Sequence, residues 1–133
     1  MINRLHNCRN PFQGETKRVL TVCSAGLLRS PTAAVVLSQP PFNFNTRPCG
    51  VNPEYALIPI DDVLINWADE IVFVHPAIEA EFKIRFADPP ADVIVLNITD
   101  TWGYRDPFLM DMIAKQYTEA LEKLAALNKE ETA

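Results

Sequence analysis

The sequence has little of what a disulfide-bonded, metal-binding or nucleic-acid-binding protein needs. Its three cysteines, Cys8, Cys23 and Cys49, are an odd number and form no C-x-x-C pair, which argues against a disulfide scaffold and a zinc cluster. Twelve Lys and Arg residues stand against seventeen Asp and Glu, for a formal net charge of -5. Because a protein that binds a polyanion needs a basic face, we expect no nucleic-acid partner.

Long apolar runs are also absent. Residues 1–17 are mostly polar, so we expect neither a signal peptide nor a membrane-spanning helix and no membrane partner. Free cysteines in such a chain favour a reducing, cytoplasmic location. Hydrophobic residues still make up 48% of the 133 residues, enough for one domain with its own core. We expect an irregular lead-in over 1–17, a domain over 18–128 and a frayed tail over 129–133.

Apolar segments alternate with amphipathic ones along the domain. Continuous apolar or β-branched runs predict strands, and Ser-Pro, Asp-Pro or Pro before an amphipathic segment predicts a helix. The expected strands are 18–23, 42–48, 71–74 and 92–96. The expected helices are 32–39 (with Ser30 as N-cap), 59–68, 76–86 and a last one after Asp106-Pro107. This order predicts a small doubly wound α/β domain, with four parallel strands and helices on both faces.

The most informative segment runs from Cys23 to Pro31. A cysteine, five residues and an arginine can wrap around one phosphate, with Arg29 closing the cradle as a planar fork. The N-terminus of the next helix adds partial positive charge, which favours the nucleophilic thiolate of Cys23. The spacing alone arises easily by chance, but here it has a strand before it and a helix start after it. Phosphate oxygens would be bound by the loop residues Ser24, Ala25, Gly26, Leu27, Leu28 and Arg29.

Three segments resemble the low-molecular-weight protein tyrosine phosphatases. The stretch from Val19 through Cys23 to Arg29-Ser-Pro-Thr-Ala33 resembles their phosphate-binding loop. Residues 67–74, Trp-Ala-Asp-Glu-Ile-Val-Phe-Val, resemble a short branch of phosphatases in that family. Asp106-Pro107-Phe108 stands where the family carries its Asp-Pro-aromatic acid loop. The similarity extends over most of the chain, from about Arg18 to about Leu124.

The resemblance implies a cysteine-dependent phosphomonoester hydrolase that needs no metal or other cofactor. Its substrate would be a phosphotyrosine protein or peptide, or a small aryl phosphate. Cys23 would be the nucleophile that forms a phosphocysteine, and Arg29 would bind the phosphate oxygens. Ser30 would donate a hydrogen bond to the thiolate. Asp106 would protonate the leaving oxygen and then activate water, and Asp100 is the other candidate for this acid.

The chain departs from the family pattern at four places. Ala25 and Gly26 stand where the loop commonly has Gly and Asn; Gly26 can adopt the left-handed turn but offers no side-chain brace. Leu28 replaces a second cysteine, so the protective disulfide of that loop is in doubt. His75 stands where many members have an acidic residue, and Phe108-Leu109 replaces a tyrosine pair.

Several residues keep two interpretations. Trp102, Tyr104 and Phe108 could form an aromatic wall for a flat substrate ring, or they could be packing residues under a long loop. His75 could tune the site or cap the helix that begins at residue 76. Cys49 could be a redox partner of the nucleophile, but a free structural thiol is the better interpretation.

Two other functions compete with the phosphatase hypothesis. An arsenate reductase-like thiol enzyme would share this fold and loop, but it would need a partner cysteine further along, and no cysteine follows Cys49. A reductase that uses external thiols stays open. A non-catalytic phosphate or phosphopeptide binder would keep its affinity after Cys23→Ser, whereas an enzyme would lose turnover.

Overall fold

The computed structural model describes residues 16–24, 29–99 and 105–132. Four strands form one sheet: β1 (Arg18–Cys23), β2 (Asn45–Gly50), β3 (Glu70–Phe73) and β4 (Asp92–Val95). Their order in the sheet is β2-β1-β3-β4, and every neighbouring pair is parallel. The predicted fold class is therefore confirmed. The order reverses at β1, and ligands of doubly wound sheets bind outside the carboxyl ends of the strands at such a switch point.

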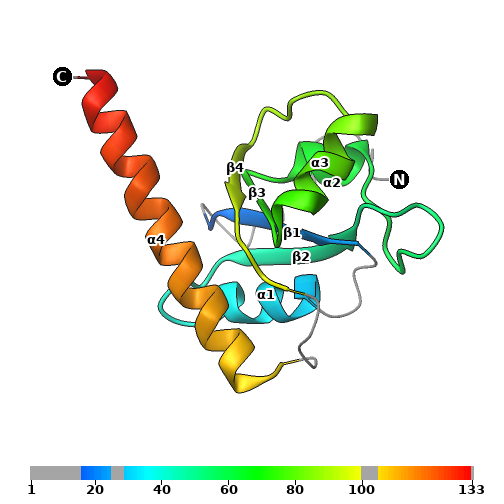
Figure 1. Cartoon of the computed structure of the whole chain (residues 1–133), viewed down its shortest axis with the longest axis horizontal. Coiled ribbons are helices and arrows are strands. Elements are labelled where there is room, and N and C mark those ends of the chain that lie inside the picture. Colours follow the sequence, from blue (N-terminus) through cyan, green and yellow to red (C-terminus); the bar gives the residue numbers. More distant parts are fainter. Residues whose placement is uncertain (1–15, 25–28, 100–104, 133) are drawn as a thin grey trace.

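Four helices within the described ranges cover the sheet: α1 (Arg29–Ser38), α2 (Asp62–Trp67), α3 (Pro76–Arg85) and α4 (Pro107–Thr132). As Figure 1 shows, α1 and α4 lie on one face and α2 and α3 on the other. The carboxyl-terminal half of α4 extends well beyond the sheet, and the helix continues through 129–132, the segment expected to form a frayed tail. No helix in the described ranges is long and apolar enough to cross a lipid bilayer.

The two central strands explain why the sequence predicted a sheet covered on both faces. All four residues of β3 are buried, and only the first residue of β1 is partly exposed. Such strands bury apolar side chains on both sides, so they appear as continuous apolar runs instead of alternating ones. The bounds of β1 are as predicted, and those of β3, α3 and β4 differ from the prediction by one residue at one or both ends.

The first helix corrects one prediction. α1 starts at Arg29, so Ser30 is the second residue of the helix and not its N-cap. The Ser30 side chain is fully buried and donates to the Cys49 carbonyl oxygen at 3.1 Å. A buried hydroxyl requires a partner, and pairing of β1 with β2 brings this carbonyl within reach. The local Ser-Pro pattern carries no information about that distant acceptor.

The second strand and second helix also have different bounds. β2 pairs in register with β1 from Arg18↔Asn45 to Cys23↔Gly50, so it begins three residues later than predicted. Phe42 and Phe44 lie before the strand, and their rings pack against Tyr117 of α4. α2 has only six residues, because the chain before it pairs with Gly50 and only then reaches the helix N-cap at Asp61.

A polar network is buried near the amino ends of β1 and β3. The Tyr117 hydroxyl donates to Glu70 Oε1 at 2.6 Å, and Lys17 Nζ donates to Glu70 Oε2 at 3.1 Å and to the Tyr117 oxygen at 3.0 Å. Lys17 also lies over the Phe44 ring, 4.5 Å from its centroid. The network joins the residue before β1, the start of β3 and the middle of α4. It therefore lies at the amino ends of the strands, away from their carboxyl ends.

Candidate active site

The carboxyl ends of β1 and β2 are held together by backbone hydrogen bonds. Val51 N donates to Cys23 O at 2.9 Å, and Asn52 N donates to Ser24 O at 3.0 Å. On the other side of β1, Val74 N donates to Val22 O at 3.0 Å. Cys23, the last residue of β1, therefore lies in the middle of the sheet edge where the strand order reverses.

Cys23 and Ser30 form a hydrogen-bonded row with the backbone of Cys49. Cys23 Sγ donates to Ser30 Oγ at 3.2 Å, and Ser30 Oγ donates to the Cys49 carbonyl oxygen at 3.1 Å. A hydroxyl rotates and both donates and accepts. When Cys23 loses its proton, the Ser30 O–H can turn from the carbonyl to the thiolate and stabilise the negative charge. The geometry brings these two predicted site residues together.

The first turn of α1 is anchored to β1 beneath this row. The Thr21 hydroxyl donates to the Ser30 carbonyl oxygen at 2.8 Å, and both residues are fully buried. Thr21 and Cys23 are two residues apart on a strand, so their side chains project from the same face of the sheet. The thiol of Cys23 therefore points to the face that α1 covers.

Arg29 is the first residue of α1 and is only 7% exposed. Its Nη1 donates to the carbonyl oxygen of Ile98, beyond β4, at 2.9 Å. Ile98 is held in turn by a bond from its N–H to Val74 O at 2.8 Å. A guanidinium carries five N–H donors in one plane, and this bond engages one of them. Sequence reasoning missed Ile98, since every residue carries a carbonyl and no pattern marks this one.

Asp106 caps α4. Its Oδ1 accepts from Phe108 N and its carbonyl oxygen from Met110 N, both at 2.9 Å. Asp106 thus makes the N-cap contacts expected of an Asp-Pro pair at a helix start, and its side chain is half-buried. One residue earlier, Arg105 N donates to the hydroxyl of Thr32 in α1 at 3.0 Å. This bond places the Asp106 segment against the first turns of the helix that carries Arg29.

The remaining predicted residues divide into three groups. Phe108 is 74% exposed, so it is not a packing residue under the loop. His75 is the N-cap of α3, where its Nδ1 accepts from Ala77 N at 3.0 Å, as the favoured interpretation predicted. Outside the described residues lie Ala25, Gly26, Leu27, Leu28, Asp100, Trp102 and Tyr104.

The sheet separates the thiols of Cys23 and Cys49. Thr46 of β2 bonds to Ala34 O of α1, whereas Arg47 stacks on Trp67 of α2 at 4.6 Å. Side chains alternate along a strand, so Cys49 projects with Arg47 toward α2, on the face opposite to Cys23. Burial, and secondarily the Cys23 and Asp61 charges, raise the pKa of the Cys49 thiol. Cys49 is thus a structural thiol in this fold.

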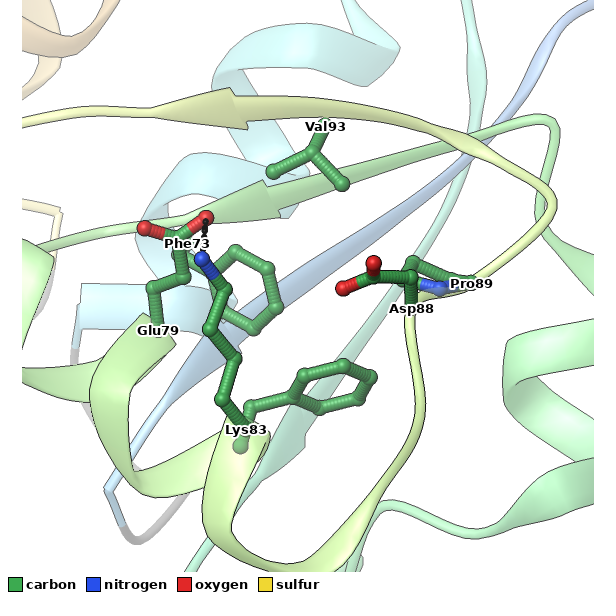
Figure 2. Close-up of a pocket in the computed structure, with 7 residues that line it drawn as sticks. Phe73, Glu79, Lys83, Asp88, Pro89 and Val93 are labelled. Atoms are coloured by element: carbon green, nitrogen blue, oxygen red, sulfur yellow. Dashed lines mark ion pairs between the residues drawn. The ribbon is translucent and has the colours of Figure 1, made fainter.

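A separate cavity of about 240 Å³ lies beneath α3. Figure 2 shows Phe73 and Val93 of the sheet at its inner side, with Glu79 and Lys83 paired at its rim. The Lys83 Nζ to Glu79 Oε2 distance is 3.8 Å. None of the predicted site residues lines this cavity. Among the residues that the structure describes, no three His, Cys, Asp or Glu side chains form a group that could hold a metal ion.

Comparison with known proteins supports the fold. No protein-family model matches the sequence, and no curated protein matches it. The solved YwlE arginine phosphatase from Geobacillus stearothermophilus is similar, with a TM-score of 0.60 and 18% identity over 86% of this chain and 96% of that one. A thioredoxin-dependent arsenate reductase of Corynebacterium glutamicum is also similar, with a TM-score of 0.53 and 14% identity.

The match to the reductase covers 88% of this chain but only 64% of the reductase. Both similarities confirm the fold expected from the resemblance to low-molecular-weight protein tyrosine phosphatases. At these identities the comparison concerns the fold.

Proposed function

We propose that the protein is a cysteine-dependent phosphomonoester hydrolase that acts on aryl phosphates, phosphotyrosine in proteins or peptides above all. The observation that carries the proposal is the row from Cys23 Sγ to Ser30 Oγ, 3.2 Å apart, at the switch point of the sheet. Arg29 lies in the same turn of α1 and is buried, and its planar fork of N–H donors suits two phosphate oxygens. A protein that only binds phosphate would not need a thiol with a hydroxyl partner.

In the first step the Cys23 thiolate attacks the phosphorus atom. An S–P bond forms while the P–O bond to the leaving group breaks, and the oxygen takes the proton of the Asp106 carboxyl. Arg29 holds two equatorial oxygens through its planar fork. We propose that backbone N–H groups of residues 24–28 complete the cradle, as the Cys-x5-Arg spacing predicts.

In the second step water hydrolyses the phosphocysteine. The Asp106 carboxylate accepts a proton from the water as its oxygen bonds to phosphorus. The S–P bond breaks, and its electron pair returns to Cys23 as thiolate. Inorganic phosphate leaves. Ser30 stabilises the thiolate both at rest and as a leaving group, because its O–H can turn toward Sγ.

Substrate choice follows from the surface around Asp106. Phe108 presents an exposed ring two residues from the proposed acid, and such a ring can stack on a flat leaving group. The solved neighbour is described as an arginine phosphatase, so phosphoarginine is the comparison substrate. Faster hydrolysis of phosphotyrosine peptide than of phosphoarginine peptide is expected.

The position of Cys49 disfavours an internal thiol relay. A reductase that resolves its intermediate within the chain needs a second thiol on the same side as Cys23, and Cys49 faces α2 instead. Burial also keeps Cys49 protonated by raising its pKa, and the thiolate is the reactive form. A phosphatase needs no second thiol.

The test is hydrolysis of para-nitrophenyl phosphate in the presence of EDTA, from pH about 5 to 8, the range in which catalytic acids and thiolates titrate. Wild type should turn over, and Cys23→Ser should not. Cys49→Ala is the matched control, because it removes the other thiol that is buried among the described residues and keeps the backbone carbonyl that Ser30 contacts. Turnover in Cys23→Ser, or none in wild type, contradicts the proposal. Thiol-dependent arsenate reduction by wild type would then favour the redox alternative.

A further inference from the structure

One hydrogen bond joins the start of α1 to the segment that carries the proposed acid. The Arg105 backbone N–H donates to Thr32 Oγ1 at 3.0 Å, across 73 residues of sequence. Thr32 is fully buried, whereas Arg105 is exposed. α1 and α4 lie side by side on one face of the sheet (Figure 1), and this bond lies at the entry to α4.

The backbone of Arg105 is in an unfavourable conformation. Its φ is 59°, in the left-handed region that residues other than glycine rarely occupy. Such a conformation persists where the surroundings hold it, and it is enriched at functional sites. The Thr32 hydroxyl supplies one such restraint, because it binds the N–H of this same residue. The next residue is Asp106.

The side chain of Asp106 has a second restraint. Phe108 N donates to Asp106 Oδ1 at 2.9 Å, which sets the orientation of the carboxylate relative to α4. The bond to Thr32 then sets the position of this unit relative to α1. Since Ser30 of the same helix contacts Cys23 Sγ at 3.2 Å, α1 provides one frame for both the nucleophile and the acid.

We infer that Thr32 is a positioning residue, whose hydroxyl holds Arg105 so that Asp106 delivers its proton to the leaving oxygen. The inference rests on the proposed phosphatase function. Thr32 makes no contact with substrate in this role; it acts through Asp106. The contribution of Thr32 should therefore depend on how much the leaving group needs a proton.

The test compares two substrates in wild type and in variants of Thr32. Phenyl phosphate has a poor leaving group that needs protonation, and para-nitrophenyl phosphate has a good one. Thr32→Val keeps the shape but removes the acceptor, and it should lower kcat/KM for phenyl phosphate about tenfold, the effect of one lost hydrogen bond. This ratio covers only the steps up to release of the leaving oxygen, so it is independent of the water step that both substrates share. The decrease for para-nitrophenyl phosphate should be smaller, and inhibition by vanadate should not change. Thr32→Ser keeps the hydroxyl and should retain most of the phenyl phosphate activity.

A double-mutant cycle identifies the partner. If Thr32 acts through Asp106, then Thr32→Val combined with Asp106→Asn should be no slower on phenyl phosphate than Asp106→Asn alone. Independent, multiplied effects would overturn the inference. Equal losses of kcat/KM on both substrates, weaker vanadate inhibition, or a Ser variant as slow as the Val variant would also overturn it, since each indicates a role in packing of the cradle.

A variant that does not fold and a failure of the proposed function can each be distinguished from a failure of the positioning role. If Thr32→Val does not fold at the assay temperature, comparing Thr32→Ser with Thr32→Ala isolates the hydroxyl, because both lack the methyl group; equal rates for these two overturn the inference. Failure of the proposed function would appear separately, as turnover that does not depend on Cys23. A wild type whose turnover requires Cys23 but not Thr32 would refute the positioning role alone.

Discussion

The buried network of Lys17, Glu70 and Tyr117 allows a sharp prediction about stability. Tyr117→Phe removes one oxygen atom and keeps the ring, which packs edge-on against Phe42 with 5.3 Å between centroids. The lost hydroxyl donates to Glu70 Oε1 at 2.6 Å and accepts from Lys17 Nζ at 3.0 Å. The variant therefore tests the hydrogen bonds without a change in packing.

The expected loss of unfolding free energy is about 2 kcal/mol, because a hydrogen bond to a charged group contributes about 1.5–3 kcal/mol. Glu70 is 2% exposed, but Lys17 remains bonded to its other oxygen at 3.1 Å. The larger cost of about 3–5 kcal/mol for a buried charge with no partner should thus be avoided. For a domain of this size the melting temperature should fall by roughly 6 °C.

The pH dependence gives a second signature. Burial, followed by the hydrogen bond to Glu70 and its charge, raises the pKa of Tyr117. The folded protein then keeps this proton at pH values where the unfolded chain, with a tyrosine pKa near 10, loses it. The stability is fully present below about pH 10 and declines above it by up to about 1.4 kcal/mol per pH unit. The difference between wild type and Tyr117→Phe should shrink over that range.

The assay is urea unfolding followed by far-ultraviolet circular dichroism at neutral and alkaline pH. Tyr55→Phe is the matched control: Tyr55 is 71% exposed, and its change should stay within about 0.5 kcal/mol. Turnover by Tyr117→Phe should equal that of wild type, since the network and Cys23 lie at opposite ends of β1, about 20 Å apart for a strand of this length. A stability loss no larger than that of Tyr55→Phe would refute the reasoning.

Three other changes test the site and its surroundings. Ser30→Ala removes the donor available to the thiolate, so kcat for para-nitrophenyl phosphate should fall on the order of tenfold or more; an unchanged kcat contradicts the role of the row. Cys49→Ala removes a thiol whose pKa burial raises; since the unfolded thiol loses its proton above about pH 8.5, wild type should lose more stability than the variant in urea titrations between pH about 8 and 10. Arg85→Ala deletes the 2.6 Å bond from Nη2 to the Val51 carbonyl oxygen; amide exchange at Val51 should become faster, and equal exchange would show that the bond does not hold this segment.

Local signals explain the parts of the fold that could be predicted. The run before Cys23 is apolar and β-branched, and its strand has the predicted bounds. His75-Pro76 pairs a side chain that can accept a hydrogen bond with a proline suited to the first helical position, and α3 begins at Pro76. These signals act within a few residues, so no tertiary contact is needed to interpret them.

The predicted caps and strand bounds were wrong where a side chain contacts a residue that is distant in the sequence. Serine is a residue type favoured at N-caps. The Ser30 hydroxyl instead bonds to Cys23 and Cys49, because β1 and β2 pair in a fixed register. Phe42 and Phe44 suit a strand by propensity, yet their rings pack against Tyr117 and the strand begins afterwards. Strand propensity depends on such packing, which the local sequence does not contain.

The sequence by itself determined the parallel α/β architecture, through its continuous apolar strands, and the place of a cysteine–arginine loop between a strand and a helix. Only the tertiary structure decided which groups the residues of the site contact: the Ile98 carbonyl on Arg29, the Thr32 hydroxyl on Arg105, and a sheet that keeps Cys49 away from Cys23. Periodicity and capping are local properties of the chain. These contacts join residues that are far apart in sequence, and they exist only after the strands have paired and the helices have packed.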